Sequence, residues 1–554
     1  MATQEFLTRT LGEQIAYMAE KYPDDVMINY TDRDYKRTWK EFNDECEIIA
    51  RGFMSLGLKK GSHIAIWATN VPQWLLTFFG SAKMGGVLIT VNTSYKIYEL
   101  DYQLKQSDTN AIVMIDGFKG TSYVDIVNEL IPELKNSEPG KLNCRKLPCL
   151  TSVIYAGEGE CPAGMVAWND LYKLAEQTPV TELEAAQKTF DCHDVVNIQY
   201  TSGTTGFPKG VMLTHYGILN NGQNIGDSMK FTHNDKLCIT VPFFHCFGMV
   251  LALMSCITHG TPFVPIDAYH PVKVMDALQS EKCTALHGVP TMFIAMLGHP
   301  DFQKYDFSNM RTGIMAGSPC PIKAMEDVIN KMNMSEIVIV FGQTEASPGC
   351  TMTTTTDPIE IRCTTVGKAF PGVECKVIDP ETGEDLPDGE IGEFCARGYN
   401  VMKGYYKMPE ATAQTIDKDG WLHSGDLVVR DSNGYYKVTG RLKDMIIRGG
   451  ENIYPKELEE CLYKYDKVSD VQVIGVPSKK YGEEVCACVI LKAGETATED
   501  DIKEYYKQNV AFFKIPKFVW IVDEFPMNGA GKIQKFKLRE MAADHFGLNN
   551  ESDN

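Results

Sequence analysis

The densest group of chemically useful side chains lies in the stretch YTSGTTGFPKG, residues 200–210. Gly203 and Gly206 within it can adopt backbone conformations closed to other residues and can approach a ligand closely. The backbone N–H groups of such a loop can form a concavity that binds an anion, the side chains of Ser202, Thr204 and Thr205 add hydroxyls, and Lys209 adds positive charge. The stretch is therefore interpreted as a loop that holds a polyphosphate. The residues concerned are Ser202, Gly203, Thr204, Thr205, Gly206 and Lys209.

The alternative is an ordinary surface loop rich in Ser, Thr and Gly. Pro208 stiffens the segment before Lys209, and the apolar run 210–213 follows at once, so we expect the loop to join two buried elements. It is not the P-loop of kinases and GTPases, because that motif needs Ser or Thr after the lysine and then a helix. Here Gly210 and Val211 follow instead.

A second group is Phe341-Gly342-Gln343-Thr344-Glu345, after the apolar run 337–340. In α/β folds ligands bind at the carboxyl ends of parallel strands, where we expect this group to lie. Glu345 could hold Mg²⁺, a hard cation that takes oxygen ligands and shares them with phosphates. The alternative, of equal weight, is a helix start with Thr344 as its cap and Glu345 in its first turn.

Five further residues are candidates, each with a structural alternative. Asp426, in SGDL, suits the hydroxyls of a ribose, and Arg441 follows it closely; either could instead form a surface ion pair. Lys532 lies among glycines and could deliver charge on a flexible arm, or be a solvated surface lysine. Gly317 could let a flat ring lie on the backbone, or mark a plain turn. His245 lies among aromatic residues and is more often a core residue than a catalyst in such surroundings.

Composition limits the class of protein. A chain of 554 residues exceeds what one hydrophobic core usually supports, so two or more domains are expected. The net charge of −19 argues against nucleic-acid binding. The 17 cysteines are scattered without metal-ligand spacing, which indicates reduced thiols and favours a cytoplasmic location. The first 25 residues do not resemble a signal peptide, and no apolar run reaches the length of a membrane span.

The order of elements predicts an α/β fold. Apolar runs of strand type alternate with helical patterns, which indicates βαβ units and a mostly parallel sheet. From about residue 367 to 440 glycines and hairpin turns dominate, which predicts a β-rich subdomain. Residues 441–554 then predict a small α+β domain. We therefore expect a large N-terminal domain, residues 1–440, and a C-terminal domain, 441–554.

In this order and spacing, the motifs make the chain resemble the adenylate-forming superfamily, over nearly its whole length. The motifs are the opening loop, FGQTE, SGDL, GRLKDMIIRGGENIYPKELE and GKIQK. The chain most resembles the medium-chain acyl-CoA synthetases grouped as acyl-CoA synthetase family member 2, through NIQYTSGTTG, GVPTMF and GEEVCACVILK. The resemblance implies that a carboxylate attacks ATP to give an acyl-adenylate and pyrophosphate, that a mobile C-terminal domain then rotates, and that CoA takes the acyl group.

The resemblance also implies roles for single residues. ATP would be bound by Thr201, Ser202, Gly203, Thr204, Thr205, Gly206, Lys209, Gly317, Ser318, Pro319, Phe341, Gly342, Gln343, Thr344, Asp426, Arg441 and Lys532. Glu345 would hold Mg²⁺, and the catalytic group would be Lys532, Thr344, Glu345 and His245, the last as a gate to the acyl pocket. Gly449, Gly450 and Glu451 would line the CoA passage, and Lys443 would be the hinge. Phe341 stands where Tyr is usual, which keeps a stacking face.

Several alternatives stay open. Within the family, the chain could be an aryl-CoA ligase or load a carrier protein; outside it, a non-catalytic nucleotide-binding protein on the same fold. Lys209, Glu345, Asp426, Arg441 and Lys532 are all present, which argues against the last. The expected acyl pocket, residues 245–254, 287–293 and 346–350, carries no fixed charge and favours a medium to long aliphatic acid. The partners expected are small molecules, namely the acid, ATP and CoA; the oligomeric state is open, with a homodimer as one alternative.

Overall fold

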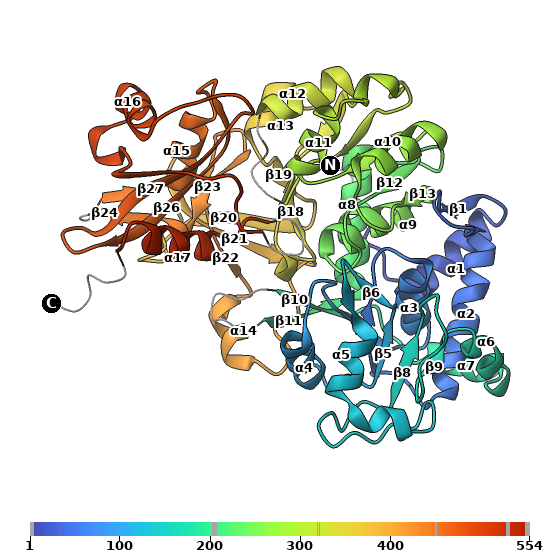
Figure 1. Cartoon of the computed structure of the whole chain (residues 1–554). Helices are drawn as coiled ribbons and strands as arrows, with labels where there is room; N and C mark the ends of the chain where they lie inside the picture. Colours follow the sequence, from blue (N-terminus) through green and yellow to red (C-terminus); the bar gives the residue numbers. More distant parts are fainter. Residues whose placement is uncertain are drawn as a thin grey trace. The chain divides into compact units, whose positions relative to one another are not determined.

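The computed structural model describes residues 5–201, 208–317, 320, 322–448, 451–527 and 532–548 (Figure 1). By their internal contacts the residues form two compact units. The first unit is Met1–Cys375 with Ala396–Leu422, and the second is Lys376–Cys395 with His423–Asn554. This division falls within the predicted β-rich segment. The expected boundary between an N-terminal domain, residues 1–440, and a C-terminal domain, 441–554, stays a prediction.

The first unit contains two seven-stranded sheets. In one, neighbouring strands are parallel except for β2, which is antiparallel to β1. Its order is β16 (Glu336–Val338), β15 (Thr312–Ile314), β14 (Ala285–His287), β12 (Leu237–Ile239), β13 (Phe263–Pro265), β1 (Val26–Asn29) and β2 (Lys36–Thr38). Helices cover both faces of a parallel sheet, so its strands are buried on both sides and appear in the sequence as short apolar runs.

The other sheet carries the predicted phosphate loop at its edge. Its neighbouring strands are parallel except for β10 and β11. Its order is β11 (Lys209–Thr214), β10 (Val195–Thr201), β4 (Val87–Thr90), β3 (His63–Trp67), β5 (Ala111–Met114), β8 (Ser152–Tyr155) and β9 (Val166–Ala167). Thr201 pairs with Lys209. The loop therefore connects the two strands of a hairpin, as the apolar runs beside it predict.

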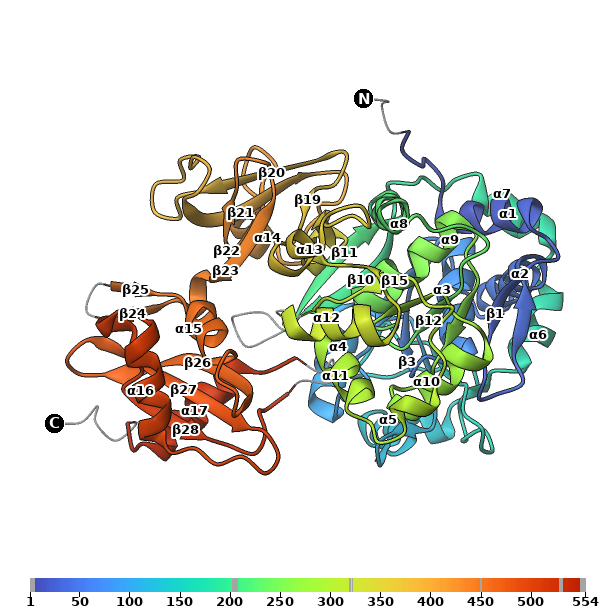
Figure 2. The ribbon, with the colours of Figure 1, turned by 90° about the horizontal axis from the view of Figure 1, so that it is seen from above.

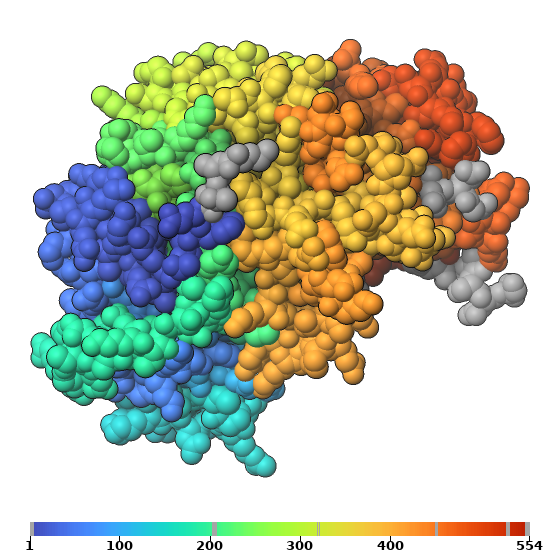
Figure 3. Space-filling model, turned by 180° about the vertical axis from the view of Figure 1, so that it is seen from behind, coloured from blue at the N-terminus to red at the C-terminus, as the bar shows by residue number. Residues whose placement is uncertain are grey.

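Helices cover both sheets of the first unit. α1 and α2 each begin at a capping box, in which Thr10 and Glu13, and Thr38 and Glu41, satisfy the exposed N–H groups. The surfaces of α1 and α2 adjoin that of residues 170–187 (Figure 3). The helices are α1 (Leu11–Lys21), α2 (Trp39–Ser55), α3 (Pro72–Lys83), α4 (Ile97–Gln106), α5 (Tyr123–Leu130), α6 (Asp170–Leu174), α7 (Val180–Gln187), α8 (His215–Met229), α9 (Ser255–His259), α10 (Pro271–Ser280), α11 (Pro290–Leu297), α12 (Ile322–Lys331), α13 (Ile359–Thr364) and α14 (Pro409–Thr415).

The apolar segment 247–259 combines two types of helix. Residues Phe247–Met254 form a π-helix, η3, and α9 follows it directly. All eight residues of η3 are buried. Helix α8 contacts it closely, since a Cβ on Gly222 would lie 2.4 Å from the Cβ of Met254. π-Helical segments are rare and often occur at functional sites, and this one begins two residues after His245.

The predicted strand 337–342 is in fact two strands. β16 ends at Val338, and β17 (Val340–Gly342) pairs instead with β18 (Gly349–Met352), which pairs with β19 (Lys368–Ala369); both pairings are antiparallel. Between β16 and β17 the backbone N–H of Ile339 donates to Oγ1 of Thr353 at 2.9 Å. The prediction that the FGQTE segment leaves a parallel strand was therefore wrong. It leaves a small antiparallel sheet, and an apolar run alone does not reveal such a change of partner.

The remaining strands are antiparallel or short. A four-stranded sheet has the order β20 (Val373–Ile378), β21 (Ile391–Gly398), β22 (Leu422–Arg430) and β23 (Tyr436–Arg441), and β6 (Gly117–Phe118) pairs with β7 (Thr121–Ser122). The single-turn helices are η1 (Pro132–Asn136), η2 (Ala175–Gln177), η4 (Phe302–Lys304), η5 (Thr344–Ala346), η6 (Leu442–Asp444) and η7 (Phe512–Lys514). None of the described helices has the length and apolar character that a bilayer crossing needs.

The second unit is built around the long hairpin of β26 and β27 (Figure 2). Alternate residues of this hairpin face two separate cores: Val485, Ala487 and Val489 pack in one, and Cys486 and Cys488 in the other. Besides β22, β23 and the short helices η6 and η7, its elements include β24 (Ile446–Arg448), β25 (Glu451–Ile453), β26 (Val468–Ser478), β27 (Gly482–Leu491), β28 (Phe518–Ile521), α15 (Pro455–Leu462), α16 (Glu499–Asn509) and α17 (Lys535–His545).

Candidate active site

Helix α4 holds both ends of the predicted phosphate loop. The hydroxyl of Tyr102 donates to the carbonyl of Pro208 at 3.0 Å, and the hydroxyl of Tyr200 donates to Oε1 of Gln106. The described residues on both sides of the loop are therefore held by the same helix. The predicted ATP residues Ser202, Gly203, Thr204, Thr205 and Gly206 themselves lie outside the described residues, whereas Thr201 and Lys209 are the paired strand ends.

Tyr405 connects the end of this loop to Glu345, a role that no motif or spacing in the sequence indicates. Its hydroxyl donates to Oε1 of Glu345 at 2.7 Å, and its ring centroid lies 4.6 Å from Nζ of Lys209. Burial, and then the Glu345 carboxylate, raises the pKa of Tyr405 well above its ordinary value, so the hydroxyl keeps its proton and remains a donor. Tyr405 is positioned by a β-bridge to Val211 on β11. The structure thus brings Lys209 and Glu345, which the sequence predicted as separate candidates, into contact with the same tyrosine.

Thr344 and Glu345 lie in the short helix η5. The backbone carbonyl of Glu345 accepts from the N–H of Met402 at 2.9 Å, which fixes the segment from the other side. Thr344 is buried, and its Oγ1 lies 3.5 Å from Sγ of Cys246. Gln343, not Thr344, precedes the first turn, and its side chain makes no capping hydrogen bond. The alternative in which Thr344 caps a helix is therefore wrong.

The predicted adenine-binding segments are described only in part. Phe341 is half-buried on β17, opposite Thr351. Gly342 must be glycine, because a Cβ there would lie 1.9 Å from the carbonyl oxygen of Pro348. Gly317 is exposed with a φ of 91°, and Ser318 and Pro319 lie outside the described residues. That these segments bracket adenine stays a prediction.

His245 lies at the start of the π-helix, and Cys246 joins it to the Thr344 segment. Its Nδ1 accepts from the backbone N–H of Phe247 at 3.1 Å. A ring nitrogen that accepts a hydrogen bond carries no proton, so the neutral ring has its proton on Nε2. The side chain is half-buried. These contacts fix the ring's tautomer, while the gating role stays a prediction.

The second unit carries its own group of predicted residues. Asp426 and Arg441 face each other across β22 and β23, with Nε of Arg441 2.8 Å from Oδ1 of Asp426. Asp426 is only 5% exposed, and this burial raises its pKa although Arg441 and Lys532 both act to lower it. Asp426 lies within β22. A buried carboxylate needs partners, and here Arg441 is a direct one.

Lys443 and Lys532 add positive charge to the same unit. Lys443 lies in η6, where burial, and then Arg441, lowers its pKa. Lys532 is close enough to Asp426 to act on that carboxyl's pKa. The predicted CoA residues Gly449 and Gly450, and the side chain of Glu451, lie outside the described residues. The structure therefore gathers Asp426, Arg441, Lys443 and Lys532, and the hinge and catalytic roles stay predictions.

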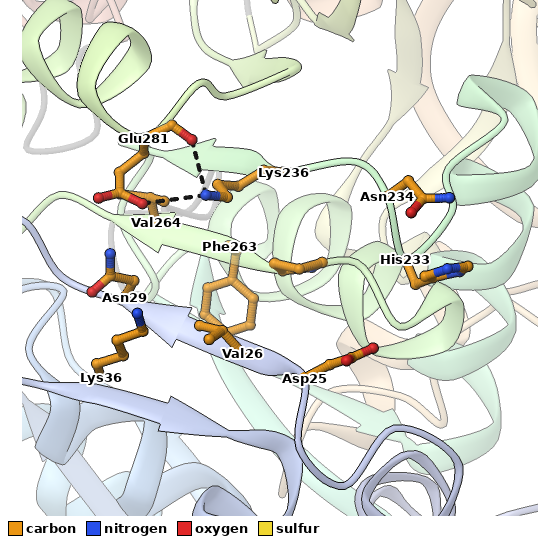
Figure 4. A pocket seen from close by; sticks show the side chains of 11 residues that line it. Asp25, Val26, Asn29, Lys36, His233, Asn234, Lys236, Phe263, Val264 and Glu281 are labelled. Carbon is orange, nitrogen blue, oxygen red and sulfur yellow. Dashed lines mark hydrogen bonds and ion pairs between the residues drawn. The ribbon is translucent and has the colours of Figure 1, made fainter.

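A cavity of about 320 Å³ in the first unit lies apart from these residues (Figure 4). It opens beside the amino ends of β12 and β13, the edge opposite to the one where ligands usually bind in such sheets. Nζ of Lys236, at its wall, is held by the Glu281 carboxylate at 3.2 Å. No predicted site residue lines it. The cavity is therefore not the candidate active site.

Known proteins are similar to this chain in both sequence and fold. The family model of the AMP-binding enzymes matches residues 15–406, and that of the AMP-binding enzyme C-terminal domain matches residues 457–532. YngI of Bacillus subtilis (strain 168), whose name assigns it as an acyl-CoA synthetase, is 50% identical over 544 residues, 98% of this chain and 99% of that protein. The mitochondrial medium-chain acyl-CoA ligase ACSF2 of Bos taurus is 38% identical over 545 residues, 98% of this chain and 88% of that protein.

The crystal structure of ATP-bound MatB from Rhodopseudomonas palustris has a TM-score of 0.82 and 29% identity, and covers 97% of this chain and all of that one. The expected α/β fold with a large N-terminal and a smaller C-terminal part is thereby confirmed. YngI and ACSF2 are named as an acyl-CoA synthetase and an acyl-CoA ligase, and each match spans 98% of this chain. The chain therefore belongs to the AMP-binding enzyme family, and within it is an ATP-dependent acid–thiol ligase of the acyl-CoA synthetase group.

Proposed function

We propose that the protein converts a medium- to long-chain fatty acid to its CoA thioester through an acyl-adenylate. The carboxylate oxygen forms a bond to the α-phosphorus of ATP, and the bond to pyrophosphate breaks. The CoA thiol then loses its proton and attacks the acyl carbonyl, and AMP leaves. The observation that best supports this is the contact of Tyr405 with both Lys209 and Glu345, which joins the phosphate loop to the carboxylate.

Glu345 is suited to hold Mg²⁺. The Tyr405 hydroxyl fixes one of its oxygens, and a carboxylate with a fixed orientation is a good ligand for this hard cation. When bound, Mg²⁺ would neutralise charge on the phosphates of ATP. Tyr405 itself keeps its proton because burial raises its pKa, so it donates a hydrogen bond to Glu345 and adds no negative charge beside it.

The second unit would supply the groups at the other end of the nucleotide. Asp426 would accept hydrogen bonds from the ribose hydroxyls, with Arg441 holding its Oδ1. Lys532 would place positive charge where negative charge develops between the carboxylate and the α-phosphate, a preorganised electrostatic effect. Lys443 would be the hinge about which the C-terminal domain rotates before the second step. After that rotation Gly449, Gly450 and Glu451 would line the CoA passage.

The preference for an uncharged aliphatic acid follows from the expected pocket wall. All eight residues of η3 are buried and uncharged, and none of residues 287–293 or 346–350 is Asp, Glu, Lys or Arg. His287 is fully buried, and burial lowers its pKa to about 3, so it is neutral at pH 7. A diacid would bring a second carboxylate to a wall without a cation, at a high cost in desolvation.

A screen of pyrophosphate release over straight-chain acids from acetate to palmitate, with benzoate included, tests the substrate class. Each acid is assayed with ATP, Mg²⁺ and CoA. We expect the highest kcat/KM among unbranched acids of medium to long chain, and little activity with dicarboxylates of equal length. A clear preference for benzoate would instead show an aryl-CoA ligase. Pyrophosphate release that is no faster with CoA than without it, and that yields no CoA thioester, would indicate an enzyme that loads another acceptor.

A further inference from the structure

Three potential metal ligands meet in the second unit, next to Asp426 in the chain but not part of the predicted site. Glu393 and Cys395 are two residues apart on β21, so their side chains point to the same face, and His423 lies on the neighbouring strand β22. Nδ1 of His423 is 3.0 Å from Oε2 of Glu393 and 3.7 Å from Sγ of Cys395. The three donor atoms all lie within 4.8 Å of one another.

The two separations from Nδ1 of His423 are close to those that Zn²⁺ requires. Bonds of about 2.1 Å to nitrogen and oxygen and about 2.3 Å to sulfur put tetrahedral donors about 3.4 Å (N and O) and about 3.6 Å (N and S) apart. The observed 3.0 and 3.7 Å differ from these values by a few tenths of an ångström, which side-chain rotation can supply. Glu393 and Cys395 are 8% and 0% exposed, whereas the His423 side chain is 30% exposed and gives access from solvent.

We propose that Glu393, Cys395 and His423 bind a thiophilic divalent cation of the Zn²⁺ class, with solvent as the fourth ligand. Binding releases the thiol proton of Cys395 and requires an unprotonated Nδ1 on His423, so the ring keeps its proton on Nε2. A thiolate and an imidazole favour such a cation over Mg²⁺, which prefers oxygen ligands. The site is therefore distinct from the one that Glu345 would form.

Metal binding at this site would stiffen the strand that carries Asp426. Oε1 of Glu393 accepts from the backbone N–H of Gly425 at 2.9 Å, and the metal would use Oε2, so both bonds can exist together. The next N–H, that of Asp426, donates to Oγ of Ser424, which in turn donates to the carbonyl of Phe394 on β21 at 2.7 Å. The cluster thus contacts Gly425, the residue before the proposed ribose ligand, and is linked to Asp426 through the backbone.

Metal titration of the full-length protein, without ATP, acid or CoA, tests the proposal independently of the proposed function. The protein is first dialysed against a chelator. Zn²⁺ affinity is then measured by competition with a chromophoric chelator, and Co²⁺ is used as a spectroscopic probe of tetrahedral thiolate ligation. We expect one equivalent bound tightly, with a thiolate-to-Co²⁺ charge-transfer band, a rise in Tm on adding Zn²⁺, and no competition from millimolar Mg²⁺.

Two variants and one matched control decide the location. Cys395→Ala should abolish the charge-transfer band, and His423→Asn should weaken Zn²⁺ binding at least about tenfold. Cys192→Ala should change neither, although Cys192 also lies in a group of three potential ligands, with Asp191 and His193. If Cys395→Ala fails to fold, His423→Asn decides the matter, because His423 is partly exposed. Unchanged binding in both cluster variants, or no Zn²⁺ binding by the parent protein, would overturn the proposal.

Discussion

Replacing Tyr405 by Phe removes one hydroxyl from the candidate active site and leaves the ring in place. The lost group donates a 2.7 Å hydrogen bond to the Glu345 carboxylate, while the ring keeps its 4.6 Å contact with Nζ of Lys209. The variant therefore separates the orientation of Glu345 from the contact with Lys209. Its effect should appear in the adenylation step, where we propose that Glu345 and the phosphates of ATP act together.

The expected size follows from the hydrogen bond. A bond to a charged acceptor contributes about 1.5–3 kcal/mol. Glu345 is half-buried, so water replaces part of the lost contact, and we take the lower limit. Because about 1.4 kcal/mol is tenfold in rate, kcat/KM for acid-dependent pyrophosphate release should fall about tenfold. Tyr405→Leu should lower it a further two- to fivefold, since the cation–π contact contributes about 0.5–1 kcal/mol at exposed sites.

The neighbouring Tyr406 provides the control. Its hydroxyl donates to Oδ2 of Asp108 at 2.9 Å, away from Glu345. Tyr406→Phe should therefore leave pyrophosphate release and its Mg²⁺ dependence near the parent values, whereas Tyr405→Phe should also need more Mg²⁺ for half-maximal rate. Equal kinetics for the two variants would refute the reasoning that Tyr405 orients Glu345.

Four further predictions concern single residues. Lys532→Ala should abolish acid-dependent pyrophosphate release but leave conversion of supplied acyl-adenylate and CoA to thioester; normal adenylation would show that its proposed role is wrong. Lys443→Pro should slow thioester formation more than adenylation, and equal loss in both half-reaction assays would argue against a pivot there. Gly342→Ala should lower the free energy of unfolding by about 3 kcal/mol, measured by denaturant melts, because its Cβ would lie 1.9 Å from the Pro348 carbonyl oxygen. The unfolded chain protonates His287 near pH 6.5 and the folded chain only near pH 3, so the free energy of unfolding falls as the pH drops through that window, by about 2 kcal/mol at pH 5. His287→Gln should remove that share of the pH dependence, and an unchanged slope would contradict it.

Local patterns predicted most of the α/β alternation in the first unit. Thr10 and Glu13 mark the start of α1 because a capping box involves residues three apart. The apolar runs beside the phosphate loop predicted the two strands that it joins, since burial of both strands leaves a direct trace in composition. The motifs from which ATP binding is proposed can be recognised in the sequence because each is a short contiguous segment.

Features that depend on distant partners could not be predicted. Tyr405 and Glu345 are 60 residues apart, and no spacing relates them. The break at Ile339 arises because its N–H finds Thr353 rather than a sheet neighbour, which an unbroken apolar run conceals. The Glu393–Cys395–His423 cluster depends on which strands are adjacent and in what register. Periodicity shows which face of an element is buried but not what it meets.

An isotope-transfer measurement tests the central claim most directly. Octanoate labelled with ¹⁸O in both carboxylate oxygens is converted with ATP, Mg²⁺ and CoA, and the products are analysed by mass spectrometry. Attack of the carboxylate on the α-phosphorus predicts that each turnover places one ¹⁸O in AMP and none in pyrophosphate. AMP without label, or label in inorganic phosphate, would contradict an acyl-adenylate pathway.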